Sequence, residues 1–78
     1  MGQYDKRYQE FLSRLRKARI EAGLTQKQVA ELLQKPQSYV SKSESGERRI
    51  DVVELVEFAR AYKKPLNYFV DIDKGMPE

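Results

Sequence analysis

The chain has 78 residues and a formal net charge of +3, and it contains neither cysteine nor histidine. A chain of this length supports one small core, so residues 1–78 are predicted to form a single domain. Disulfides, thiolate or imidazole metal sites and histidine-based acid–base catalysis are excluded, so we expect no cofactor and no enzyme. Because no apolar run approaches the roughly 20 residues that span a bilayer, and no signal peptide is seen, a soluble intracellular protein is expected.

Basic residues are concentrated in the first part of the chain. Residues 1–50 hold eleven Lys and Arg against six Asp and Glu, whereas residues 51–78 hold four against six. A basic surface on one side of a domain suits a polyanionic partner. An unevenly charged, solvated surface explains the same numbers equally well, so charge alone does not choose between the two interpretations.

Apolar residues near the start of the chain recur at three- and four-residue spacing, which predicts a helix over about residues 5–22. Gly23 follows as a left-handed cap of that helix. We expect its tyrosines to pack in the core or at its rim rather than to stack on bases, because they share the stripe with phenylalanine and leucine. The members of the stripe are Tyr4, Tyr8, Phe11, Leu12, Leu15 and Ala18.

Two short helices joined by a tight turn are predicted next. Thr25 and Gln28 have the spacing of a capping box, so a helix is expected over residues 26–33. Pro36 has the fixed φ that is preferred at a helix start, which predicts another helix over residues 36–45. The inward face of the pair is predicted to consist of Val29, Ala30, Leu33 and Val40.

Asp51 and Glu54 repeat the capping-box spacing and predict a fourth helix, which Lys63 and Lys64 close. Pro65 begins a short fifth helix that runs to about residue 70, and residues 71–78 are predicted to fray. The fold class is therefore all-α, with a core of about residues 5–70. The fourth helix has more apolar residues than one face needs, which either contact with a second subunit or burial among neighbouring helices explains.

The side chains at the start of the third helix are small or slender and polar. A helix that reads bases enters a major groove about 12 Å wide, so its leading side chains must reach base edges without obstruction. Gln37 can bind adenine through two hydrogen bonds, Ser38 can donate or accept, and Lys42 can donate to guanine or phosphate. Ser41 lies on the same side of the helix. These residue types at this spacing favour a DNA-reading helix over a plain bundle.

Several spaced motifs match one known pattern across residues 12–69. Its parts are Leu15 with Arg19, the run Gly23 to Gln26, Ala30, the run Ser41 to Gly46, and Leu55, Ala59, Pro65 and Phe69. In these positions the chain resembles the lambda-repressor-like, Cro/C1-type (XRE family) helix-turn-helix regulators. The resemblance implies a five-helix lambda-repressor-like domain that binds double-stranded DNA.

The resemblance also implies roles for individual residues. Arg19 and Glu44 are expected to form a largely buried ion pair between the first and third helices, with a phosphate contact of Arg19 as the alternative. Loss of a phosphate contact should weaken binding to all sequences alike, whereas loss of a base contact should relax the choice at one base pair. The expected base contacts are Gln37, Ser38, Ser41 and Lys42. The expected phosphate or backbone contacts are Gln26, Tyr39, Arg48 and Arg49. Gln26 is also expected to brace the third helix, and a thymine methyl is the alternative contact for Tyr39.

Two positions depart from the family pattern. Gln34 occupies a turn position that usually holds glycine, so it either adopts a left-handed backbone at a cost of about 1–2 kcal/mol or shifts the turn. Ser43 stands where the family usually has an apolar or aromatic anchor, and its hydroxyl can donate back to the carbonyl of Tyr39. A looser core, a compensating neighbour and an engineered replacement all remain open.

The function expected from these features is a sequence-specific DNA-binding transcriptional regulator. We expect a repressor or autoregulator, cytoplasmic in a prokaryote or encoded by a phage, that binds a palindromic operator as a homodimer through helices four and five. An alternative is the antitoxin or controller protein of a two-gene module. A protein-interaction bundle without DNA binding is the alternative from another class, and Gln26, Gln37, Lys42, Arg48 and Arg49 argue against it.

Overall fold

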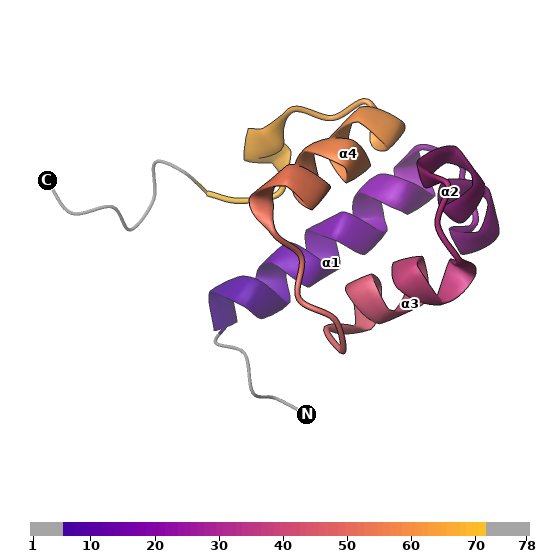
Figure 1. The fold of residues 1–78 in the computed structure, drawn as a ribbon. Coiled ribbons are helices and arrows are strands. Elements are labelled where there is room, and N and C mark those ends of the chain that lie inside the picture. The colour runs from indigo at the N-terminus through magenta and orange to yellow at the C-terminus, as the bar shows by residue number, and fades with distance from the viewer. Residues whose placement is uncertain (1–5, 72–78) are drawn as a thin grey trace, which may run out of the picture.

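The structure is a computed structural model that describes residues 6–71, and these residues form four α-helices followed by one 3₁₀ turn (Figure 1). The all-α prediction is confirmed. The expected fifth helix is a single 3₁₀ turn, because the N–H groups of Tyr68 and Phe69 donate to carbonyls only three residues back. The elements are α1 (Lys6–Glu21), α2 (Gln26–Leu33), α3 (Gln37–Ser45), α4 (Val52–Tyr62) and η1 (Leu66–Tyr68).

Two predictions concern the ends of the chain. Tyr4 and residues 72–78 lie outside the described residues. Asp71 was predicted to begin a frayed tail, but its carboxylate accepts hydrogen bonds from both Nη atoms of Arg14 at 3.0 and 3.1 Å. The chain is therefore still attached to α1 at residue 71.

Both predicted capping boxes are present. Thr25 Oγ1 accepts a hydrogen bond from the Gln28 N–H at 3.1 Å, and Gln28 Oε1 accepts one from the Thr25 N–H at 2.9 Å. Asp51 and Glu54 make the same pair of bonds at the start of α4. Pro36 has a ψ of 154°, which is extended backbone, so it precedes α3 and the helix begins one residue later than predicted. These local bonds fix where α2 and α4 begin.

A residue with left-handed backbone follows each of the four α-helices in residues 6–71. Gly23, predicted as the cap of the first helix, has a φ of 74°. Gly46 has a φ of 86°, and Gln34 and Lys63 each have a φ of 59°. At Gln34 the left-handed backbone lets successive N–H groups donate to the carbonyls of Glu31 and Ala30, which would otherwise lack partners at the end of α2. Of the two options for Gln34, the chain therefore uses the left-handed backbone. Lys63 repeats the arrangement after α4, which was not predicted.

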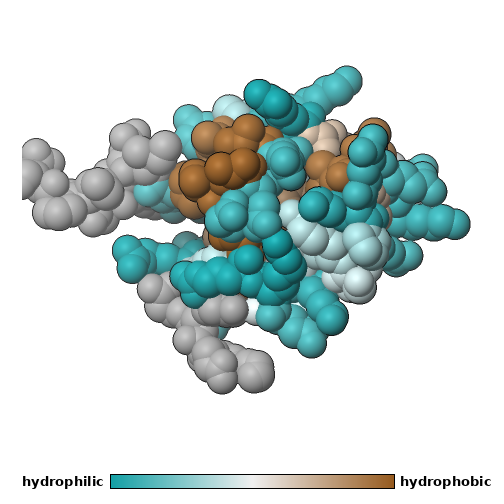
Figure 2. Space-filling view, viewed as in Figure 1, coloured by the Kyte–Doolittle hydropathy of each residue, from teal (hydrophilic) through white to brown (hydrophobic). Residues whose placement is uncertain are grey.

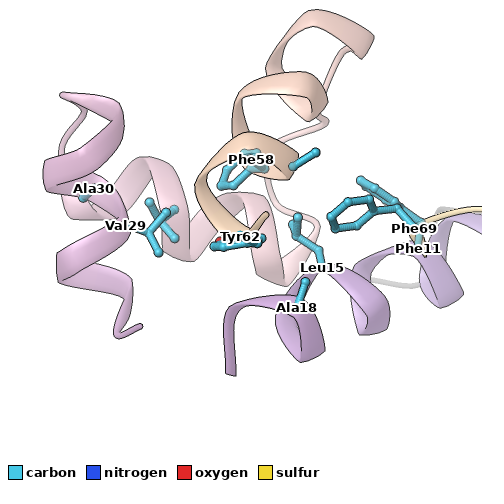
Figure 3. Packing of buried hydrophobic residues seen from close by; sticks show 10 residues of the cluster. Phe11, Leu15, Ala18, Val29, Ala30, Phe58, Tyr62 and Phe69 are labelled. Atoms are coloured by element: carbon cyan, nitrogen blue, oxygen red, sulfur yellow. The ribbon is translucent and has the colours of Figure 1, made fainter. Parts of the chain in front are cut away.

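The core lies where α4 crosses α1 (Figures 1 and 3). Phe11 packs against Phe69 with ring centroids 6.4 Å apart, which holds the chain after η1 to α1. Figure 3 shows Tyr62 between Val29 and Leu15, so one ring joins α4 to both α1 and α2. The buried hydrophobic residues are Phe11, Leu15, Ala18, Val29, Ala30, Val40, Phe58, Ala59, Tyr62 and Phe69.

Part of the apolar surface of α4 is not covered. Phe58 and Tyr62 are buried, but Val52 and Val53 are 70% and 66% exposed at the start of the helix. The surplus of apolar residues in this helix is therefore only partly explained by its neighbours within the domain. Within residues 6–71, no helix is both long and apolar enough to cross a membrane.

Replacing Gln34 with glycine should stabilise the fold. The residue is exposed and has a left-handed backbone, so Gln34→Gly removes steric strain without losing packing. We expect the free energy of unfolding in urea to rise by about 1 kcal/mol. Gln34→Ala is the matched control, because alanine keeps the strain and should give no gain. A glycine variant less stable than the alanine variant would contradict this account of the turn.

Candidate nucleic-acid interface

The helix α3 presents polar side chains outward and small side chains inward. Gln37, Ser38 and Lys42 are exposed and Ser41 is half-buried, whereas Val40 is fully buried on the other side of the helix. The structure therefore brings the four predicted base-contact residues onto one side of one short helix. Figure 1 places α3 at the edge of the bundle.

Arg19 and Glu44 connect α1 to α3. Arg19 Nε lies 2.6 Å from Glu44 Oε2 and Nη2 lies 3.2 Å from Oε1, which is the bidentate geometry that favours arginine over lysine. Only 13% of the Arg19 side chain and 5% of the Glu44 side chain are exposed. The remaining Nη1 of Arg19 donates to the Leu24 carbonyl at 3.0 Å. This geometry favours the ion pair over a phosphate contact of Arg19.

Gln26 adds a third donor to the same carboxylate. Its Nε2 donates to Glu44 Oε1 at 3.0 Å, so one carboxylate of α3 is bonded to α1 and to the first residue of α2. The bonds from Arg19 and Gln26 satisfy a carboxylate that would be costly to bury alone. The start of α2 and the helix α3 are thereby held in one fixed relation.

Tyr39 is half-buried and packs against the core, and the DNA contact predicted for it stays a prediction. Its ring stacks on the ring of Phe58, with centroids 6.0 Å apart and planes 11° apart. Its hydroxyl is buried and has no hydrogen-bond partner among the described residues. Burial raises the pKa of this phenol. The side chain therefore attaches α3 to α4.

Arg48 is paired within the protein. Its Nη1 donates to Glu54 Oε1 at 3.1 Å, its Nη2 donates to Glu54 Oε2, and its guanidinium carbon lies 4.2 Å from the centroid of the Tyr39 ring. The hydrogen bond from Arg48 holds the pKa of the Glu54 carboxyl below its usual value. Tyr39, Arg48, Glu54 and Phe58 are called the Tyr39 cluster below.

Arg49 lies over a different ring. Its guanidinium carbon is 4.4 Å from the centroid of Tyr8, whose hydroxyl accepts a hydrogen bond from the Ile50 N–H at 3.1 Å. Tyr8 is half-buried, and its ring centroid lies 5.3 Å from that of Phe11, as expected for packing at the rim of the core. Arg49 is exposed, so it is a charge presented next to α3 from the connection that follows it.

Sequence reasoning missed the Tyr39 cluster. Glu54 was interpreted only as a helix cap, although its Oε1 accepts from both the Asp51 N–H and Arg48 Nη1. Ser43 behaves as expected, because it is fully buried and its hydroxyl donates to the Tyr39 carbonyl at 2.7 Å. The signal that could have pointed to the cluster is Ser43 itself. Because this position lacks the usual apolar or aromatic side chain, a different residue of α3 must attach the helix to the rest of the domain.

A helix-turn-helix whose second helix carries an exposed polar row, with arginines just beyond it, has the features of a DNA-binding module. The family model described as helix-turn-helix (HTH_3) matches residues 15–69. A solved structure titled "XRE-family like protein from Pseudomonas syringae pv. tomato str. DC3000" is 46% identical, with a TM-score of 0.76, over 81% of this chain and 77% of that chain. No match was found among curated proteins.

The chain belongs to the XRE-type helix-turn-helix family of DNA-binding regulators. The similarity extends through α4 and η1 as well as the two motif helices, so it covers the scaffold and the exposed polar row of α3 together.

Neutralising Glu44 should destabilise the fold strongly. In Glu44→Gln, the Arg19 guanidinium keeps its charge in a mostly buried position without a carboxylate. We expect the free energy of unfolding to fall by about 3–5 kcal/mol in urea titrations followed by circular dichroism. Glu47→Gln is the control, because Glu47 is exposed just beyond the same helix and should change stability little. Equal effects of the two substitutions would contradict the structural role of the ion pair.

Proposed function

We propose that this DNA-binding regulator is a repressor or autoregulator that binds a palindromic operator as a homodimer. The observation that carries the proposal is the exposed polar row on α3, together with the bonds that fix this helix through Glu44. A recognition helix gains specificity only if its orientation is fixed before it enters the groove. The ion pair between Arg19 and Glu44 supports such an orientation in the free protein.

Base reading is assigned to the exposed side of α3. Gln37 stands at the first position of the helix, where the side chain extends from the end that enters the groove, and its amide can pair with N6 and N7 of adenine. Ser38 and Ser41 are short enough to let the helix approach closely, although the Ser41 hydroxyl also donates to the Ser38 carbonyl at 3.3 Å. Lys42, one turn further along, can donate to guanine or to phosphate.

Phosphate contacts are assigned to the two ends of the motif. Gln26 stands at the start of α2, where N–H groups without helical partners and the helix dipole favour a phosphate. Arg49 extends from the connection after α3 and is exposed. A phosphate at each end of the motif would fix the register of α3 along the groove while leaving sequence choice to the helix itself.

A second copy of the chain is proposed to cover the exposed apolar residues of α4 and the segment after η1. Val52 and Val70 line one groove, whose lining also includes Leu55 and Phe69. Figure 2 shows apolar surface gathered over this part of the molecule. Val53 of α4 is 66% exposed and Leu66 of η1 is 41% exposed. A twofold dimer would place two recognition helices on successive turns of DNA, about 34 Å apart.

Replacing Gln37 should relax the choice of base at one position of the operator. A consensus is first obtained by selecting from a random duplex pool, and Gln37→Ala is then titrated against single-base variants of it. We expect a loss of about 1–3 kcal/mol for the consensus and a smaller preference at one base pair in each half-site. Asn67→Ala, at an exposed position of η1, should bind like the wild type. An unchanged preference at every position would contradict the role of Gln37.

Charges on the exposed valines of α4 should disrupt self-association. Val52→Asp and Val53→Asp place carboxylates at the start of a helix, where the dipole favours them, so the fold should be kept. We expect sedimentation equilibrium at micromolar concentration to give a dimer for the wild type and a monomer for the double variant. Leu32→Asp, at a residue 59% exposed on α2, is the control and should remain dimeric. A wild type that is monomeric both free and on DNA would refute the dimer.

A further inference from the structure

Arg48 is bonded to the recognition helix and to α4 at once. Its N–H donates to the Lys42 carbonyl at 3.0 Å, and its guanidinium donates through both Nη atoms to Glu54 on α4. The same guanidinium covers the ring of Tyr39, which stacks on Phe58 of α4. The side chain therefore connects α3 to α4 in addition to the direct contact between the two rings.

The charge of Arg48 is already neutralised within the Tyr39 cluster. Both oxygens of Glu54 accept from it, and only 31% of the Arg48 side chain and 22% of the Glu54 side chain are exposed. A DNA phosphate that captured this guanidinium would take it away from a carboxylate and from an aromatic face. It would also leave the Glu54 charge unpaired beside the DNA, which is unfavourable next to a polyanion.

The Tyr39 cluster compensates for the small residue at position 43. Ser43 is fully buried but fills little volume, and its hydroxyl is already bonded to the Tyr39 carbonyl. The aromatic contact between α3 and α4 is instead made one turn earlier, by the ring of Tyr39. Tyr39 is adjacent to Ser38 and two residues from Gln37, so fixing its ring fixes the rotation of that turn about the helix axis.

We propose that Arg48 and Glu54 are positioning residues for DNA reading, an inference that rests on the proposed function. Together they hold Tyr39 against Phe58. The position of Tyr39 in turn sets how α3 presents Gln37 and Ser38 to the bases. Arg48 then contributes to recognition through Tyr39 and not through a phosphate. This differs from the phosphate contact that the sequence resemblance implied for Arg48.

The two roles for Arg48 predict opposite effects of Glu54→Gln. Glutamine keeps an oxygen that can accept from the Asp51 N–H, so the capping box of α4 is retained. If Arg48 positions Tyr39, loss of the ion pair loosens the ring and weakens binding to the operator. If Arg48 holds a phosphate, the same change frees the guanidinium and removes a negative charge near DNA, so binding becomes tighter.

The test compares wild type, Glu54→Gln, Arg48→Lys and Arg48→Gln in titrations of the selected operator and of a random duplex over a range of salt. We expect each of the three variants to bind the operator about tenfold more weakly, because lysine supplies charge but neither the bidentate bond nor the stacking. Affinity for the random duplex should change much less, and the salt dependence for operator binding should stay the same. A merely structural loss of folded protein would lower both affinities equally.

Tighter operator binding by Glu54→Gln would overturn the proposal. So would an Arg48→Lys variant that binds like the wild type, or an Arg48→Gln variant whose slope of log affinity against log salt is smaller by about 0.9, the value for one lost phosphate contact. A wild type that binds no duplex at all would refute the proposed function itself, and this outcome is distinct because the wild type is measured first.

An observation on the wild-type protein avoids dependence on variants that fold poorly. The ring of Tyr39 should shift the side-chain proton resonances of Arg48 upfield in the nuclear magnetic resonance spectrum of the free protein. We expect this ring-current shift to persist in the operator complex. Its loss on binding DNA would show that Arg48 leaves Tyr39 for a phosphate, and the proposal would be wrong.

Discussion

The arrangement of the first three helices depends on the buried carboxylate of Glu44. It belongs to α3, and it accepts hydrogen bonds from Arg19 of α1 and Gln26 of α2. Burying this charge without those donors would cost several kcal/mol, so only a narrow set of helix orientations is compatible with a stable fold. In a domain whose core is this small, the orientation of the recognition helix follows from the need to satisfy one charge as much as from apolar packing.

A second constraint acts on α3 through Tyr39. The ring of Tyr39 contacts Phe58, and Arg48 with Glu54 covers that ring. The ion pair through Glu44 fixes α3 relative to α1 and α2, while the Tyr39 cluster fixes it relative to α4. The polar row of α3 is left outside both sets of contacts.

The helices could be predicted from residues close together in the sequence. The Tyr39 cluster could not, because its members come together only in the folded chain. Thr25 and Asp51 define helix starts through bonds to residues three positions away, so the sequence contains all the needed information. Tyr39 carries both an apolar ring and a hydroxyl, so its sequence position alone does not say whether it packs inside or faces a partner. Its placement depends on contacts with Phe58 and Arg48, which only tertiary packing brings close to it. The left-handed backbone of Lys63 could not be predicted either, because lysine has no preference for that conformation. The hydrogen bonds at the end of α4 impose it.

The most direct test of the central claim is to map the DNA-binding surface in solution. Backbone amide resonances are assigned in the free protein and followed while the selected operator duplex is added. We expect the largest shifts on the exposed side of α3, at Gln37, Ser38, Ser41 and Lys42, and at the start of α2. Shifts confined to α4 and the segment after η1, with α3 unaffected, would contradict this claim.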